Sequence, residues 1–308
     1  MQEDPLVSIV TPSYNSAAYL KETIESVLSQ DYPRIEYIVV DGGSTDGTIE
    51  ILERYKERLR YVSGPDSGAA EAINRGFEVS HGSIFAWLSA DDTYLPGAVS
   101  TAVRYLTSDP NLAAVYGEAY WVSGQGAVLG RYPTQPFDPE LLGRECYICQ
   151  PASFLRRAAF QEVGMLDAAL ESAFDYDLWI RMSKRYRFSE LQERLATSRM
   201  HGCSKTLGRR AQVFRETFRI LKRHYAYVPF QWVYGYCCYL LDKRDQFYEP
   251  LRPSIFKYFL SPPLGCCYNW DQIGRYWREW RSVMSLAGLI RRWNESWIAR
   301  ALGLHSRR

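Results

Sequence analysis

The sequence lacks several features that mark other classes of protein. Its seven cysteines are an odd number, which does not suit a secreted disulfide framework. The pair Cys146 and Cys149 has no second pair at zinc-binding spacing, so we expect reduced, partly buried thiols instead of a metal or redox centre. No uninterrupted apolar run approaches the roughly 18 residues that would span a bilayer.

A glycine-rich phosphate loop is also missing near the start of the chain. Residues 11–18 contain neither glycine nor a cationic side chain, and the first apolar run is not followed by Gly-x-Gly-x-x-Gly. Both absences argue against a nucleotidyltransferase and against a dinucleotide-dependent oxidoreductase.

The charges of the chain nearly cancel, and a formal net charge of +2 gives no indication of a nucleic-acid partner. They are unevenly distributed, because residues 1–200 carry 18 basic and 28 acidic side chains whereas residues 201–308 carry 19 and 7. Length and this change in texture predict a main domain over residues 1–207 and a basic, aromatic-rich, helical extension over residues 208–308.

Apolar runs and amphipathic segments alternate through the first half of the chain. This alternation predicts an α/β fold with a Rossmann-like, mainly parallel sheet flanked by helices. The expected strands are residues 7–11, 37–40, 59–62, 84–88, 113–120 and 187–191, and the expected helices are 20–28, 49–55, 69–79, 97–107 and 175–185.

Polar groups follow three of these strands at the point where each one ends. Asp41 and two glycines follow the second strand, Pro12 to Asn15 follow the first, and Asp91 and Asp92 come shortly after the fourth. Because ligands bind beyond the carboxyl ends of strands in an open parallel sheet, these residues predict a binding site at one edge.

Five motifs, taken in this order, resemble those of the family 2 glycosyltransferases. That family has the GT-A fold and uses nucleotide sugars, so the resemblance implies a catalytic domain that binds a nucleotide-sugar donor. The motifs are residues 7–15 (VSIVTPSYN), 39–48 (VVDGGSTDGT), 65–68 (PDSG), 74–76 (NRG) and 90–92 (ADD).

The resemblance assigns nucleotide contacts to three of the strand ends. Asp41 would read the base or the ribose, whereas Tyr14 would either stack on the base or simply pack. It does not identify the base as uracil, guanine or thymine, although a UDP-sugar is the first expectation. The full set of implied nucleotide contacts is Thr11, Tyr14, Asn15, Asp41, Asp66, Asn74 and Asp91.

The resemblance also implies a divalent metal, Mn²⁺ or Mg²⁺, held by Asp91 and Asp92 against the diphosphate. The family motif is commonly Asp-x-Asp, and Ser89 stands at the first of those places, so either aspartate could be the main metal ligand. His201 resembles a late histidine that completes the metal site in many GT-A enzymes. A helix cap is the alternative reading of the two aspartates.

The resemblance also implies a catalytic base within residues 174–181 (FDYDLWIR). It assigns Asp175 as the general base of an inverting transfer and places Phe174 where the family often has glutamate. Asp177 is the rival, but two residues along a helix it points in another direction. Gln150, before Pro151, and Trp179 are assigned to the donor or acceptor sugar, and a simple turn is the other reading of Gln150.

The tail mixes aromatic and cationic residues, which indicates either an interface with lipid or a helical subdomain with a basic face. Pro253, Pro262 and Pro263 are expected to break the tail into short helices.

Residues 1–5 are acidic and run into a strand, so we expect no signal peptide. We expect a cytoplasmic protein that is peripheral at the inner face of a membrane. Its acceptor would be a glycan or a lipid-linked sugar. A non-catalytic protein that binds a nucleotide sugar is the alternative.

Overall fold

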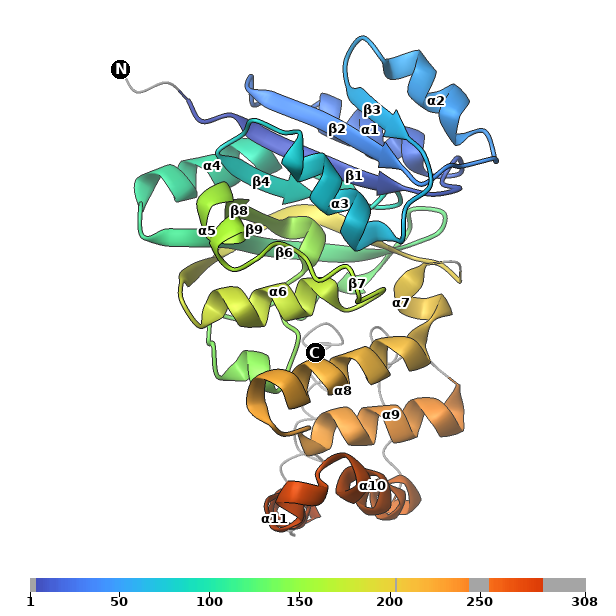
Figure 1. The fold of residues 1–308 in the computed structure, drawn as a ribbon, viewed down its shortest axis with the longest axis vertical. Helices are drawn as coiled ribbons and strands as arrows, with labels where there is room; N and C mark the ends of the chain where they lie inside the picture. Colours follow the sequence, from blue (N-terminus) through green and yellow to red (C-terminus); the bar gives the residue numbers. More distant parts are fainter. Residues whose placement is uncertain (1–3, 203, 244–254, 285–308) are drawn as a thin grey trace. The chain divides into compact units, whose positions relative to one another are not determined.

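The computed structural model describes residues 4–202, 204–243 and 255–284, which fall into two compact units (Figure 1). The first unit takes in the described residues of 1–139 and 147–200, and the second takes in those of 140–146 and 201–308. The first unit therefore ends close to the boundary predicted after residue 207, and the assignment of separate functional domains stays a prediction.

Four parallel strands form one half of the sheet in the order β3-β2-β1-β4. Their register brings Ser13, at the end of β1, opposite Asp41, at the end of β2. The carboxyl ends of these strands therefore share one edge, as the sequence predicts. The elements are β1 Val7–Ser13, α1 Leu20–Leu28, β2 Ile35–Asp41, α2 Thr48–Tyr55, β3 Arg60–Ser63, α3 Ala69–Glu78 and β4 Ile84–Trp87.

The other half of the sheet is mixed. After β4 the order continues β8-β6-β9-β5, with β6 and β9 parallel and the other neighbours antiparallel, and β7 forms a hairpin with β6. The elements are β5 Thr93–Tyr94, α4 Ala98–Ser108, β6 Leu112–Ser123, β7 Val128–Arg131, η2 Gln150–Ala152, β8 Ser153–Arg156, α5 Arg157–Glu162, α6 Phe174–Ser183 and β9 Arg187–Met200.

The helices pack on the sheet through their apolar faces. Leu20, Ile24 and Val27 of α1 recur at helical spacing and are buried. Helix α3 approaches β1 so closely that a Cβ at Gly76 would lie 2.5 Å from Cγ1 of Val10. Glycine is therefore needed at residue 76 for α3 to reach the strand at whose end the predicted site lies.

The second unit is helical, as the sequence predicts for the tail. Helices α8 and α9 run side by side (Figure 1). The buried Asn269, after α10, holds the segment before α9, because its Oδ1 accepts a hydrogen bond from the backbone N–H of Val228 at 2.8 Å. The elements are η1 Leu141–Gly143, α7 Lys205–Gly208, α8 Arg210–Tyr225, α9 Phe230–Asp242, α10 Ile255–Tyr268, η3 Trp270–Gln272 and α11 Ile273–Met284.

One prediction about the tail is wrong, because Pro262 and Pro263 lie inside α10 and do not break it. Pro262 has no N–H for the carbonyl of Tyr258, one turn earlier. That carbonyl accepts other hydrogen bonds instead, from Nε1 of Trp280 at 3.0 Å and from Oγ of Ser261 at 2.8 Å. Pro253 lies outside the described residues.

Two cysteines follow one another in α9. Cys237 and Cys238 are buried and free. Burial, together with the neighbouring Cys238, raises the pKa of Cys237 to about 11. Its thiol therefore stays protonated near neutral pH, which makes it a poor nucleophile and metal ligand. Within the described ranges, no helix combines the length and the hydropathy needed to cross a bilayer.

Candidate active site

The loops that follow β1 and β2 are joined by a dense set of hydrogen bonds. Asn15 lies in the left-handed region with φ 48°; its backbone N–H donates to Oγ of Ser44 at 2.7 Å, and its Oδ1 accepts from the N–H of Thr45 at 2.9 Å. The N–H of Ala17 donates to Oδ2 of Asp46 at 3.0 Å. These contacts fix the two loops as one rigid edge.

Asp41 is the centre of this edge and is completely buried. Its Oδ2 accepts hydrogen bonds from the N–H groups of Gly43 and Ser44 at 3.0 and 2.9 Å and from Oγ of Ser63 at 2.7 Å. Its Oδ1 accepts from Oγ of Ser44 at 2.5 Å. The protein therefore supplies four donors to this carboxylate. Opposite it, the buried hydroxyl of Ser13 has no hydrogen-bond partner among the described residues.

The other predicted nucleotide contacts lie in different surroundings. Tyr14 is 66% exposed, and Asp66 lies against the Asp41 loop, since a Cβ at Gly42 would be 3.0 Å from Oδ2 of Asp66. Tyr14, Asn15, Asp41 and Asp66 are therefore brought together. Thr11 is buried with its hydroxyl 3.0 Å from that of Tyr37.

The observed hydrogen bonds of the Asn74 side chain go to Leu166 and not to the loops after β1 and β2. Its Nδ2 donates to the carbonyl of Leu166 at 2.9 Å, and its Oδ1 accepts from the N–H of the same residue at 3.1 Å. This pair of hydrogen bonds holds α3 to the chain after α5. The nucleotide roles of Thr11 and Asn74 stay predictions, and both side chains have structural partners.

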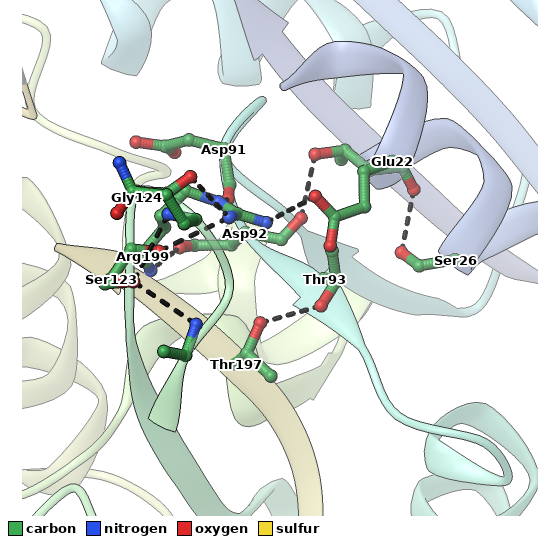
Figure 2. A network of polar contacts seen from close by, with 12 residues as sticks. Glu22, Ser26, Asp91, Asp92, Thr93, Ser123, Gly124, Thr197 and Arg199 are labelled. Carbon is green, nitrogen blue, oxygen red and sulfur yellow. Dashed lines mark hydrogen bonds and ion pairs between the residues drawn. The ribbon is translucent and has the colours of Figure 1, made fainter. Parts of the chain in front are cut away.

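Asp91 and Asp92 follow β4 in a network that Figure 2 shows from close by. Asp92 is buried, and its Oδ1 accepts the backbone N–H of Arg199 at 2.8 Å, while its carbonyl accepts Oγ1 of Thr23 at 2.8 Å. Asp91 is half-buried beside it. The pair is therefore held between α1 and β9.

Arg199 is a part of this site that the sequence did not reveal. Its buried guanidinium donates Nε–H to the carbonyl of Asp91 at 2.8 Å and forms an ion pair with Glu22 at 2.6 Å (Figure 2). It also donates to the carbonyl of Gly124 at 3.2 Å and lies 4.8 Å from the ring of Tyr19. Arg199 therefore positions the two aspartates by joining segments that are far apart in sequence.

The surroundings of Asp92 disfavour the charged form of its carboxyl group. Burial, and then the charge of Asp91, raise the pKa of Asp92 well above its ordinary value, and contacts with Arg199 offset this only in part. A divalent cation would favour the charged form. Two carboxylates suffice for Mg²⁺ or Mn²⁺ when phosphate oxygens complete the coordination, so the residues present fit the expected metal.

His201 belongs to the second unit. In the part of the chain that the structure describes, no three side chains of His, Cys, Asp or Glu are grouped so that they could hold a metal ion. The role of His201 as a third metal ligand stays a prediction, and so does the choice between Asp91 and Asp92 as the main ligand.

Two acids at the start of α6 have different environments. Asp177 is completely buried, and its Oδ2 accepts Nε–H of Arg181 at 2.7 Å. Arg181 in turn donates to the carbonyls of Val163 and Met165, both at 2.6 Å. Asp175, in the first turn of the helix, is only partly buried. Asp177 is thus committed to an ion pair, and Asp175 is the acid that a substrate could reach.

Gln150 and Trp179 both contact Trp87, the last residue of β4. Gln150 donates Nε2–H to the carbonyl of Trp87 at 2.6 Å, so it borders the segment that leads to Asp91. Trp179 is buried and stacks on Trp87 with ring centroids 5.7 Å apart. Their contacts with a sugar stay predictions, and the position of Trp179 in the core makes packing its observed role.

Relatives of this chain are found among bacterial glycosyltransferases. An uncharacterized glycosyltransferase of Rickettsia prowazekii is 32% identical over 218 residues, which cover 66% of each chain. The chondroitin synthase of Pasteurella multocida is 30% identical over 202 residues, which cover 64% of this chain and 21% of that enzyme. The matched region therefore spans two thirds or less of the length of these relatives.

Solved structures share the fold. TarS of S. aureus (residues 1–349, in complex with UDP-GlcNAc) has a TM-score of 0.61 at 16% identity, with 88% of this chain and 83% of that chain covered. The mannosyltransferase PcManGT of Pyrobaculum calidifontis, in complex with GDP-Man and Mn²⁺, has a TM-score of 0.56 at 16% identity, with 97% and 81% covered. The predicted GT-A fold is confirmed.

The family model described as glycosyl transferase family 2 matches residues 8–164. This match includes the loop of Asp41, the Asp91 and Asp92 pair, and Gln150. From the match, the relatives and the fold together, the chain belongs to glycosyl transferase family 2.

Proposed function

We propose that this chain transfers a sugar from a nucleoside-diphosphate sugar to a hydroxyl group of a glycan or lipid-linked acceptor, with inversion at the anomeric carbon. A UDP-sugar is the preferred donor, which the complexes of TarS with UDP-GlcNAc and with UDP support. The complex of PcManGT with GDP-Man makes a GDP-sugar the second candidate.

The observation that carries this proposal is the pair of carboxylates after β4. Asp92 is buried with one hydrogen-bond donor from the described residues, and Asp91 lies next to it. Two adjacent carboxylates repel each other, and a bound cation would relieve this repulsion. A divalent metal bound there would neutralise the negative charge of the departing diphosphate.

Asp175 performs the proton transfer in this proposal. Its carboxylate accepts the proton of the acceptor hydroxyl as that oxygen bonds to the anomeric carbon and the bond to the diphosphate breaks. Arg199 holds Asp91 and Asp92 in place, and Tyr14 and the loop that Asp41 organises bind the nucleoside. An α-linked donor would therefore give a β-linked product.

A release assay tests the proposal. The protein is incubated with Mn²⁺ or Mg²⁺ and a panel of UDP-, GDP- and dTDP-sugars, with and without chelator, and free nucleoside diphosphate is measured. We expect release from one donor that the chelator abolishes. Equal release of nucleoside diphosphate with and without chelator would contradict metal assistance. Nucleotide binding without release, even with glycan and lipid-linked acceptors present, would favour a non-catalytic binding protein.

A further inference from the structure

Helices α10 and α11 of the second unit expose an apolar surface that the proposed transfer does not use. On α10 the outward side chains recur at positions 256, 259, 260, 263 and 267, which is the spacing of one helix face. All five are apolar or sulfur-containing, and Phe256 and Phe259 are 66% and 59% exposed. A face of this kind is unusual on a helix that has a buried opposite side.

The surface continues from α10 onto α11. The rings of Phe259 and Trp280 are 6.0 Å apart, and those of Trp280 and Trp277 are 5.3 Å apart. Ile273, one turn before Trp277, is 42% exposed. We name this surface the aromatic face, and it consists of Phe256, Phe259, Leu260, Ile273, Trp277 and Trp280.

Trp280 is fixed within the aromatic face by a polar contact at its inner end. Its Nε1–H donates to the carbonyl of Tyr258 at 3.0 Å, the carbonyl that Pro262 leaves without its helical donor. The indole is therefore held in one orientation with its polar atom satisfied. The ring system presents carbon to its surroundings, as tryptophan does at the boundary between water and lipid.

Cationic residues alternate with the aromatic positions of α11. Arg278 and Arg281 of α11 are exposed. The acids nearby are engaged, since Glu279 accepts a hydrogen bond from the hydroxyl of Tyr227 and Asp271 forms an ion pair with Lys222 at 2.7 Å. Lys257, the cation of α10, is buried against Asp242.

We propose that the aromatic face is a docking surface for an anionic lipid bilayer, with its rings in the interface and Arg278 and Arg281 on lipid phosphates. Exposed aromatic side chains bordered by arginine are the composition of helices that lie in the plane of a membrane surface. A second copy of the chain is a poorer partner. A symmetric contact would gather the arginine side chains of both copies around one apolar patch, where their like charges repel.

Vesicle flotation of the full chain tests this surface. Vesicles of phosphatidylcholine with phosphatidylglycerol are compared with vesicles of phosphatidylcholine alone, at low and high salt. We expect recovery with the anionic vesicles that high salt reduces. The variant Phe256→Ser/Phe259→Ser should reduce it at least about tenfold, because two exposed aromatic anchors are lost. Arg278→Gln/Arg281→Gln should reduce it about fivefold for each charge removed.

A matched control is available on β7, where Val128 and Leu129 are 63% and 45% exposed. Val128→Ser/Leu129→Ser removes exposed apolar area elsewhere and should leave flotation unchanged. Quenching of tryptophan fluorescence by brominated lipid gives a second measurement on the unmodified protein, independent of whether a variant folds.

Three results would overturn the docking surface. They are equal flotation of the unmodified protein and the Phe256→Ser/Phe259→Ser variant, equal recovery on neutral and anionic vesicles, and self-association in sedimentation that the variant abolishes while flotation is unaffected. Flotation needs neither donor nor acceptor, so failure of this inference is distinguishable from failure of the proposed transfer.

Discussion

The loops that follow β2 and β4 each hold a buried aspartate, but the protein surrounds the two carboxylates differently. Asp41 receives four hydrogen bonds from Gly43, Ser44 and Ser63. Asp92 receives one from the described residues, the backbone N–H of Arg199. These hydrogen bonds stabilise the carboxylate of Asp41. Burial and the charge of Asp91 disfavour the charged form of Asp92, and Arg199 offsets this only in part.

The same difference separates the two acids of α6. Asp177 is buried in an ion pair with Arg181, and Asp175 is partly exposed in the first turn. In each pair one acid is held by the contacts given above, and the proposed function assigns the chemistry to the other. The comparison teaches that the number and charge of the surrounding donors, more than burial alone, decide how completely the fold stabilises a carboxylate.

The largest expected effect is on transfer, from Asp175→Asn. A positioned base typically contributes about 10²- to 10⁴-fold, so the rate should fall by that factor while nucleotide binding is retained. Kinetics with saturating donor and a binding titration on the same protein measure both. Normal turnover by the variant would remove Asp175 from the role of base.

The next effect concerns Asp92→Asn, which removes the charge that a cation requires. Donor turnover should fall about 10²- to 10³-fold, the range seen when one electrostatic stabiliser is lost. The melting temperature should stay unchanged or rise, because an incompletely paired buried charge is removed. A marked loss of stability would place Asp92 with Asp41 as a structural residue.

Asp41→Ala should show the opposite behaviour, with a loss of about 2–4 kcal/mol in the free energy of unfolding, because several donors lose their acceptor. Denaturant titration measures this value, and Asp92→Asn is the matched control at less than about 1 kcal/mol. Equal losses in the two variants would end the distinction between them.

Arg199→Lys should cost about 1–3 kcal/mol, since an ammonium group cannot reproduce the bonds of the guanidinium to Asp91, Gly124 and Glu22. Chemical denaturation checks this. A fully stable variant would show that the fork of hydrogen bonds does not hold the loop of Asp91.

The smallest expected effect concerns Glu36, near the start of β2 and therefore at the opposite end of the strand from Asp41. Burial acts to raise the pKa of Glu36, but hydrogen bonds from Ser8 and His81 outweigh it and hold the pKa below the ordinary value of 4.5. The lowered pKa stabilises the fold above pH 4.5, and this stabilisation is lost as the pH falls through the folded-state pKa.

Glu36→Gln should therefore lower stability at pH 7 and flatten the acid limb of the stability profile. Melting temperatures between pH 3 and pH 7, on the order of one value for each half unit, measure the slope. An unchanged slope of melting temperature against pH would show that the hydrogen bonds from Ser8 and His81 do not stabilise the charged form of Glu36.

The sequence predicted the elements whose signals are local. Strands β1 to β4 and the helices between them follow from alternation and helical spacing, and the sharing of one edge by Tyr14, Asn15 and Asp41 follows from parallel order. The parts that were not predicted depend on distant partners. Strand β5 has two residues and is defined by pairing Thr93 with Thr197, and β9 runs well past the residues 187–191 expected.

The same reason explains the missed arginine and the wrong expectation for the tail. Arg199 contacts Glu22, which lies 177 positions away, and no local pattern marks that pairing. Pro262 is tolerated within α10 because Trp280, on the next helix, supplies the missing donor. Local sequence rules do not include the distant contacts that give Arg199 its partners and that let α10 continue through Pro262.

Uptake of Mn²⁺ in the presence of UDP or GDP, followed by electron paramagnetic resonance, tests the central claim most directly. The unmodified protein should take up Mn²⁺ together with one nucleotide, and Asp92→Asn should lose this uptake without loss of melting temperature, while Glu36→Gln retains it. Equal uptake by the unmodified protein and Asp92→Asn would contradict the assignment of the carboxylates after β4 to the metal.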